Sequence, residues 1–181
     1  MTINIFKYIQ TQITIIKYNL SEYKRYSNLL KIILKTKSRK ILEIGVYKGL
    51  RSLEMIQAAQ SFNSRVVFFG FDMFEMFFEK KNILTNELSK KPKTMRVIND
   101  LLKKHANVKL IKGNTLITLP KFSKKKKFDF IFIDGGHSVK TIRSDWNQSK
   151  KLMHNNSIVI FDDYYLGDIK LTKKFGCNRI V

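Results

Sequence analysis

The stretch "FDFIFIDGGHS" ends an apolar segment on an acid, two glycines and a histidine. A buried strand needs neither a carboxylate nor an imidazole at its end, so this end should face a ligand. Gly135 and Gly136 keep the corner open, and His137 follows directly. Histidine exchanges protons near neutral pH, so His137 could act as a general base beside Asp134. The alternative is that His137 caps a helix starting near Ser138.

Two further acids occur in "FDDYY", after another apolar segment. Asp162 and Asp163 would join Asp134 if the two strands are neighbours. Three converging carboxylates repel one another unless a cation binds or one carboxyl stays protonated. Carboxylate oxygens suit magnesium, so a metal site of Asp134, Asp162 and Asp163 is one hypothesis. Adjacent strand residues point in different directions, so a site using only one of the pair, or none, stays open.

A glycine-containing turn follows the first apolar segment, in "LEIGVYKG". Gly45 and Gly49 would let the backbone turn tightly and approach a ligand before a helix begins at Leu50. The pattern is G-x-x-x-G, not the G-x-G-x-x-G of dinucleotide sites, which disfavours a pyrophosphate. Glu43 would repel a pyrophosphate but would suit a cationic ligand. An ordinary strand-to-helix turn is the alternative.

The second and third apolar segments also end on polar residues. Asp72 could accept hydrogen bonds from ribose hydroxyls, or it could cap the segment beginning at Met73. Asn114 and Thr115 could face a nucleobase, or they could form an ordinary turn. Together with Glu43, these residues indicate a nucleoside that carries positive charge.

Strands must alternate with helices to bring these ends together. The expected strands are Lys40–Ile44, Val66–Phe71, Val108–Ile111, Phe128–Ile133 and Ser157–Phe161. The expected intervening helices are Leu50–Gln60, Thr94–His105 and Val139–Met153. This alternation predicts an α/β fold with a doubly wound, mostly parallel Rossmann-like sheet. Ligands of such sheets bind at the carboxyl ends of the strands, where all five polar features lie.

Two helices should precede the sheet, one from Ile5 to Leu20 and one from Glu22 to Leu34. The 181 residues suit one domain, and a hydrophobic content of 44% argues against disorder. The single cysteine fits a reducing compartment, and no apolar run is long enough for a membrane span or a signal core. We therefore expect a cytoplasmic protein without a membrane span.

The chain has 35 basic and 14 acidic residues and a formal net charge of +21. Such a surplus is typical of proteins that bind polyanions. The lysines are spread along the chain, apart from Lys124–Lys127, which favours a solvated basic surface over a dedicated nucleic-acid site.

The motifs "ILEIGVYKG", "FFGFDMFE", "FDFIFIDGGHS" and "SIVIFDDYY", in this order, resemble class I S-adenosylmethionine-dependent methyltransferases. More narrowly, they resemble the branch of macrocin-type sugar O-methyltransferases and cephalosporin-hydroxylase-like proteins. The resemblance covers about residues 38–180. It implies a cofactor-binding domain over residues 38–181, preceded by the helical segment over residues 1–37 that the apolar spacing predicts. In macrocin-type relatives the aspartates hold a divalent metal, so Mg²⁺ is an implied second cofactor.

The resemblance also assigns contacts with S-adenosylmethionine. The residues expected at its methionine end are Glu43, Gly45, Tyr47 and Gly49. Asp72 would hold the ribose, Met73 would flank the adenine, and Asn114 with Thr115 would lie close to the base. Asp134 would lie beside the transferred methyl group.

Two departures from the family pattern stand out. Tyr47 replaces the middle glycine of the commonest first motif, and the chain stops where a further helix and hairpin would follow. We therefore expect a domain that is C-terminally truncated relative to the family.

The predicted function is O-methylation of a small hydroxylated acceptor such as a glycoside, with His137 as base and Asp134 beside it. A nucleic-acid methyltransferase acting on RNA is the first alternative, because the positive net charge would allow contacts with phosphates. "IDGG" differs from the Asn/Asp-Pro-Pro-aromatic pattern of enzymes that methylate base amino groups. A non-catalytic protein that binds S-adenosylmethionine is the second alternative.

Overall fold

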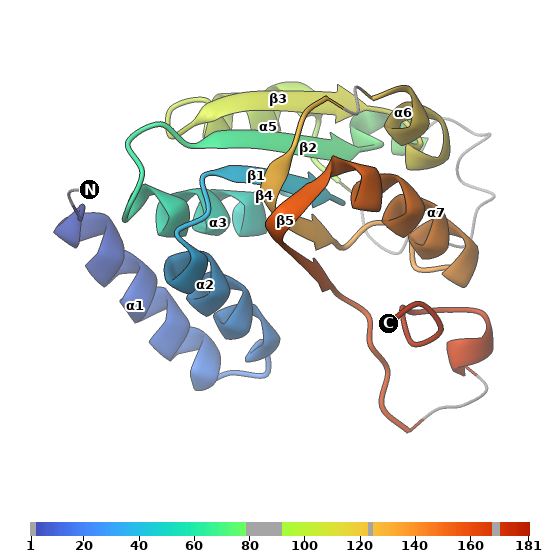
Figure 1. The fold of residues 1–181 in the computed structure, drawn as a ribbon, viewed down its shortest axis with the longest axis horizontal. Helices are drawn as coiled ribbons and strands as arrows, with labels where there is room; N and C mark the ends of the chain where they lie inside the picture. The colour runs from blue at the N-terminus through green and yellow to red at the C-terminus, as the bar shows by residue number, and fades with distance from the viewer. Residues whose placement is uncertain (1–2, 79–91, 123–124, 168–170) are drawn as a thin grey trace.

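A computed structural model describes residues 3–78, 92–122, 125–167 and 171–181 of the chain. One sheet of five strands forms its centre, in the order β3-β2-β1-β4-β5 (Figure 1). The strands are β1 (Lys40–Ile44), β2 (Val67–Asp72), β3 (Asn107–Lys112), β4 (Phe128–Ile133) and β5 (Met153–Phe161). All four strand pairings are parallel. The predicted parallel, doubly wound sheet is therefore confirmed.

Helices connect the strands, and two more precede them. They are α1 (Ile5–Asn19), α2 (Arg25–Thr36), α3 (Leu50–Gln60), α5 (Met95–Leu102), α6 (Thr115–Lys121) and α7 (Val139–Ser149). Short 3₁₀ helices cover Phe74–Phe78, Lys150–Leu152 and Leu171–Lys173. No described helix has the length and apolar character that crossing a membrane requires.

Besides the short 3₁₀ helices and shifts of one to three residues at the ends of other elements, two elements differ from the sequence prediction. Helix α6 was not expected, because it is short and contains Pro120; the side chain of Asn114 caps it by accepting from Leu116 N at 2.9 Å. Strand β5 begins at Met153, where a helix was expected to continue. Its first residues, "MHNN", lack apolar alternation, and an irregular register separates the pairing of Met153 from that of Ile158.

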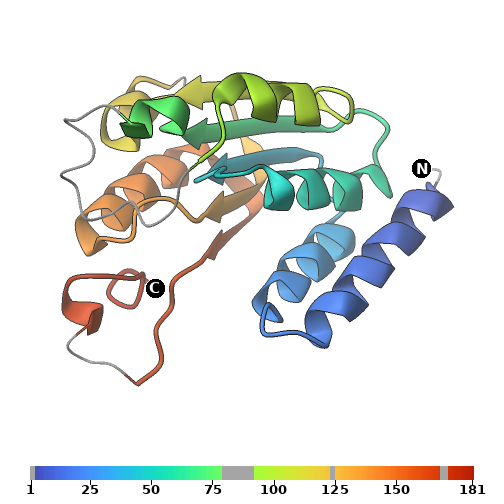
Figure 2. The same cartoon turned by 180° about the vertical axis from the view of Figure 1, so that it is seen from behind.

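The sheet is covered on both faces. Successive strand residues point to opposite sides, so each strand serves two cores. Helices α2, α3 and α5 pack on the face that carries Ile41, Phe68 and Phe130. Helices α6 and α7 pack on the face that carries Leu42, Phe69 and Ile131. Figure 2 shows the two helical layers from the opposite side.

The parallel register brings the strand ends to one edge. Ile44 at the end of β1 pairs with Phe71 of β2 and with Ile133 of β4. Ile133 in turn pairs with Phe161, the last residue of β5. The topological switch lies between β1 and β4, because the chain leaves β1 toward β2 on one side and returns to β4 on the other. The loops that follow β1 and β4 therefore face each other.

Candidate functional site

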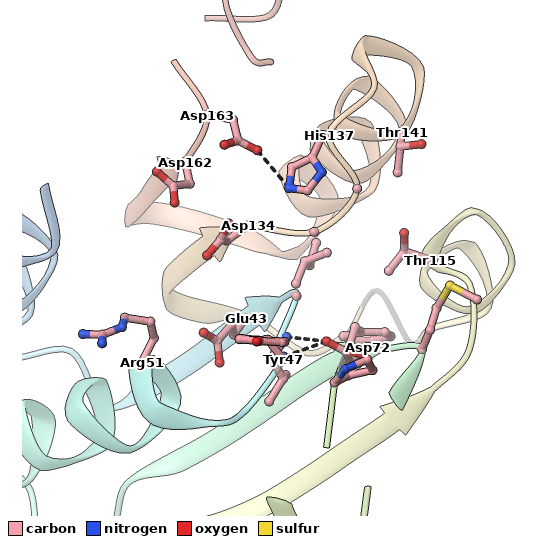
Figure 3. Close-up of a pocket in the computed structure, with 18 of the residues that line it drawn as sticks. Glu43, Tyr47, Arg51, Asp72, Thr115, Asp134, His137, Thr141, Asp162 and Asp163 are labelled. Carbon is pink, nitrogen blue, oxygen red and sulfur yellow. Dashed lines mark hydrogen bonds and ion pairs between the residues drawn. The ribbon is translucent and has the colours of Figure 1, made fainter. Parts of the chain in front are cut away.

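A cavity of about 630 Å³ lies at the carboxyl edge of the sheet. Residues from the ends of β1, β2, β4 and β5 line it, together with the loop after β3 and the start of α2. Figure 3 shows the acidic side chains converging on this space from neighbouring strands. Among the described residues that line it are five acids, namely Glu43, Asp72, Asp134, Asp162 and Asp163. Arg25, Lys48 and Arg51 line the same cavity, so acids outnumber Lys and Arg among its described lining residues in a protein of net charge +21.

Glu43 lies at the floor of this cavity, near the end of β1. Its side chain is only 1% exposed, and the Ser52 hydroxyl of α3 donates a hydrogen bond to it. Burial raises its pKa to about 8, the Ser52 hydrogen bond opposes this increase, and the Asp72 carboxylate adds to it. A positive group above Glu43 would favour the charged carboxylate. The geometry therefore suits a cationic ligand.

The turn after β1 is held by Asp72. Both Val46 N and Tyr47 N donate to Oδ2 of Asp72 at 2.8 Å. The other oxygen, Oδ1, accepts from Phe74 N at 2.7 Å, so the capping role considered for Asp72 is present as well. Tyr47 has a left-handed φ of 52°, a conformation that is unfavourable for residues other than glycine. The carboxylate thus fixes a strained turn and also lines the cavity.

Gly45 allows the β1 and β4 ends to touch. Its φ is 91°, and a Cβ built there would lie 1.9 Å from the carbonyl oxygen of Asp134. Its N–H donates to Phe71 O at 2.8 Å, and Asp134 N donates to Ile44 O at 2.8 Å. Only glycine fits this crossing of two backbones.

Asp134 and His137 follow β4 as predicted, and both line the cavity. Burial, together with the neighbouring carboxylates of Asp162 and Asp163, holds the pKa of Asp134 well above its usual range. The His137 ring lies next to Asp163, with 3.5 Å between Nε2 and Oδ2 (Figure 3). Burial raises the pKa of Asp163, and the nearby His137 opposes that increase.

A segment near the C-terminus is hydrogen-bonded to the backbone around His137 and Asp163. Gly176 N donates to His137 O at 2.8 Å, and Val139 N donates to Lys174 O at 3.0 Å. Cys177 N donates to Asp163 O at 3.1 Å. The backbones of both members of the histidine–aspartate pair are therefore bonded to one segment. His137 does not cap α7 with its side chain, because Ser138 accepts from Thr141 N instead.

The three aspartates are close neighbours but do not form a metal site in this structure. Asp162 Oδ1 accepts from Nε of Arg25 at 3.1 Å, so its charge is already partnered. Within residues 3–78, 92–122, 125–167 and 171–181, no group of three His, Cys, Asp or Glu side chains is arranged to hold a metal ion. The predicted set of Asp134, Asp162 and Asp163 therefore does not fit a metal ion as these side chains lie.

Comparison with protein families matches residues 42–164 to the family described as "Methyltransferase domain". The match begins in β1 and ends just after β5, so it contains the strand ends that line the cavity. The chain belongs to this family.

Solved structures share the fold of this methyltransferase domain. The O-methyltransferase TomG from Streptomyces achromogenes, involved in tomaymycin synthesis and solved with S-adenosylmethionine, has a TM-score of 0.58 and 18% identity; the match covers 79% of this chain and 56% of TomG. An O-methyltransferase from Bacillus cereus, solved with S-adenosylhomocysteine, has a TM-score of 0.53 and 19% identity over 87% of this chain and 66% of that one.

MycE, a methyltransferase of the mycinamycin biosynthetic pathway solved with Mg and S-adenosylhomocysteine, has a TM-score of 0.50 and 18% identity over 75% of this chain and 30% of MycE. The chain thus spans 66% or less of the length of these three proteins. No curated protein matches the sequence.

Most of the other predicted contacts of the methyltransferase domain also line the cavity. Tyr47, Met73, Asn114 and Thr115 all belong to its wall. The side-chain oxygen of Asn114 accepts one hydrogen bond in capping α6, so its amide nitrogen and the second lone pair of its oxygen are left for a ligand. Gly49 differs, because it is not among the described residues that line the cavity. It has a φ of 76° at the start of α3 and faces side chains of α5.

Sequence reasoning missed the contribution of α2. Tyr23, just before α2, and Arg25 and Tyr26 at its start all line the cavity, although they precede the first strand. Arg25 lies over the Tyr26 ring, 4.6 Å from its centroid, while it binds Asp162. The rule that ligands meet strand ends does not extend to a preceding helix. The available signal was the polar cluster "EYKRY" at the start of an otherwise apolar helix.

Proposed function

We propose that this methyltransferase domain binds S-adenosylmethionine and transfers its methyl group to a hydroxyl of a small acceptor. One observation carries the proposal: a strongly basic protein gathers five acids around one cavity at the switch point of its sheet. S-adenosylmethionine carries a sulfonium and an ammonium group as well as a carboxylate, so its net charge is positive and acids suit its two cationic groups. Membership in the methyltransferase family supports the same cofactor.

The proposed cofactor pose follows from the groups that remain available. Glu43 would meet the ammonium of the methionine end, beside the turn at Gly45 and Tyr47. Each carboxylate oxygen can accept about two hydrogen bonds, and Asp72 Oδ2 already accepts two from the backbone. Oδ1 accepts one, so Asp72 has room for one ribose hydroxyl. Met73 and Asn114 would flank the adenine.

Methyl transfer needs the acceptor oxygen, the methyl carbon and the sulfur in line, and little other help from the protein. The acceptor oxygen forms the new bond to carbon, the sulfur keeps the electron pair of the broken bond, and the hydroxyl proton leaves. In our proposal His137 takes this proton. Asp163, 3.5 Å from the ring, lies where its charge balances the positive charge that the ring acquires. No step requires a metal ion.

The acceptor is proposed to be a small hydroxylated molecule such as a glycoside. Tyr23, in the turn before α2, lines the cavity and is 49% exposed, so its ring can contact a sugar. The Tyr26 ring also lines the cavity, but Arg25 and Arg51 lie over it. The RNA alternative is less favoured, because a phosphate backbone would meet the same acids.

Two measurements test the proposal. Titration calorimetry should detect binding of S-adenosylhomocysteine by the folded protein, and a screen of glycosides and RNA with radiolabelled S-adenosylmethionine should identify a methylated acceptor. Absence of cofactor binding would refute the proposal. Binding without turnover of any acceptor would favour the non-catalytic alternative, and labelling of RNA alone would favour the nucleic-acid enzyme.

The role of His137 has a matched control in the same chain. His154 also lies beside an aspartate, with 3.0 Å between its Nε2 and Oδ1 of Asp129, but at the opposite edge of the sheet. His137→Ala should lower turnover by about 10²–10⁴-fold, the usual contribution of a positioned base, with little change in cofactor affinity. His154→Ala should leave turnover unchanged. Equal losses in both variants would exclude His137 as the base.

A further inference from the structure

Helix α1 presents an uncovered apolar stripe. Its inner side is held by its buried residues, Thr11 and Ile15, and by contact with α2 and α3. Its outer side, with the C-cap residue Leu20, carries six large apolar side chains that are 48–84% exposed, namely Ile5, Phe6, Ile9, Ile13, Ile16 and Leu20. In Figures 1 and 2, α1 lies at the margin of the molecule, on the side of α2 away from the sheet. Contiguous exposed apolar residues of this kind mark an interaction surface.

The spacing of the stripe indicates a helical partner. The residues Phe6, Ile9, Ile13, Ile16 and Leu20 are separated by steps of three, four, three and four. This alternation is the a/d pattern of coiled coils, in which one narrow seam faces another helix. Here that seam is exposed, whereas the residues that hold α1 to the fold lie on its other side. The seam is therefore available to a second helix.

The stripe is also nearly symmetric about its middle. Ile13 lies at the centre, Ile9 and Ile16 lie four and three residues away, and Phe6 and Leu20 each lie seven residues away. A two-fold contact between identical chains must be self-complementary in this way. An antiparallel pair centred on Ile13 would place Phe6 of each copy beside Leu20 of the other.

Charge favours the same arrangement. The charged residues of α1 are Lys7 and Lys17, although the chain as a whole carries +21. Lys7 lies one turn before the buried Thr11 and near His105, on the inner side of the helix, so only Lys17 lies beside the seam. A parallel pair would set Lys17 beside its own copy, whereas the antiparallel pair sets it near Ile9. A helix that lies on an anionic membrane usually has many basic residues on its polar face, which α1 lacks.

We propose that α1 is a dimerisation helix that pairs antiparallel with α1 of a second copy of this chain. Two helices of about four turns form an interface near the lower end of the specific range, so a dissociation constant on the order of micromolar is expected. The dimer would also brace the cavity, because α1 packs on α2, which carries Arg25 and Tyr26.

Analytical ultracentrifugation of the full chain from about 1 to 100 μM tests the proposal. The wild type should pass from monomer to dimer, and added salt should strengthen the dimer by screening the repulsion of two basic chains. Ile13→Glu should weaken it by roughly 100-fold or more, because the substitution acts on both copies at the centre of the contact. Ile117→Glu is the matched control, since Ile117 is 57% exposed on α6. Circular dichroism would verify that both variants fold.

Two results would overturn the proposal. One is a monomer throughout the concentration range, and the other is a dimer that Ile13→Glu does not weaken. If the monomer instead sediments with vesicles of equal parts phosphatidylcholine and phosphatidylglycerol, and salt releases it, the stripe is a membrane surface.

Cysteine cross-linking tests the orientation. In the antiparallel pair, Phe6→Cys and Leu20→Cys variants should form a disulfide with each other when mixed, but neither should do so alone. A disulfide formed by each variant alone would indicate the parallel arrangement and refute the proposed one. The natural Cys177 is buried and should not interfere.

Discussion

The wild-type protein should release a proton when it binds S-adenosylmethionine, and the Glu43→Gln variant should lack this release. Burial raises the pKa of Glu43 to about 8, so about nine-tenths of the molecules hold this proton at pH 7. In the proposed pose the ligand's ammonium lies against this carboxyl, and a neighbouring cation favours the charged form. Binding should therefore release about 0.5–0.9 proton per ligand at pH 7.

Titration calorimetry in two buffers measures this release, because the apparent enthalpy changes with the ionisation enthalpy of the buffer. The ligand's own amino group also titrates near this pH, so the decisive quantity is the difference between wild type and Glu43→Gln. Glu54→Gln is a suitable control. Burial raises the pKa of Glu54 to about 7, but its carboxylate pairs with Arg51 and is not among the described lining residues. A release that is the same in wild type and Glu43→Gln would refute the assignment.

The same residue should shape the stability of the ligand-free protein. The unfolded carboxyl loses its proton near pH 4.5 and the folded one near pH 8. Between these values the folded state binds more protons, so the free energy of unfolding falls as the pH rises. Each pKa unit corresponds to about 1.4 kcal/mol, so the full window amounts to roughly 5 kcal/mol. Glu43→Gln should therefore melt at a higher temperature than wild type at pH 8.5, with no such gain at pH 4.

Three further predictions concern the cavity. Asp72→Ala should weaken S-adenosylhomocysteine binding in calorimetry by about 1–3 kcal/mol, because charge-assisted hydrogen bonds to the turn and the ribose are lost; unchanged affinity would contradict its role. Gly45→Ala should unfold at a clearly lower temperature than Gly167→Ala, because both positions have a positive φ but, of the two, only Gly45 lies against another backbone segment. Equal decreases in melting temperature would show that the backbone conformation alone matters. Arg25→Gln should bind magnesium more tightly than wild type in calorimetry, because Asp162 loses its partner; equal affinities would show that the guanidinium does not compete with a metal.

The sequence predicted the centre of the fold well because strands buried on both faces are distinctive. The bounds of β1, α3 and β4 agree with those expected, since each is a compact apolar or amphipathic segment between clear turn signals. The beginning of β5 was missed because its first residues have no apolar pattern. Helix α6 was missed because it is short and contains a proline, which usually signals a helix boundary.

The site was predictable as far as strand ends determine it. Asp72 and Asp134 were found because parallel strands must deliver their ends to one edge. The role of Arg25 was not, because its contact with Asp162 depends on how α2 packs against the sheet. Gly49 was assigned to the ligand by a motif, but it serves the packing of α3 against α5. Spacing alone does not distinguish a glycine that admits a ligand from one that admits a neighbouring side chain.

The acidic cavity has a consequence for how the proposed enzyme would bind its cofactor and release the demethylated product. S-adenosylmethionine enters with a sulfonium charge, and S-adenosylhomocysteine leaves without it. The carboxylates around the cavity attract the first more strongly than the second, so the used cofactor is held less firmly than the fresh one. The basic exterior acts in the opposite sense, because it repels a cationic cofactor at a distance and draws anionic molecules toward the protein. Cofactor capture should therefore become faster as salt screens the exterior, whereas an anionic acceptor would arrive more slowly.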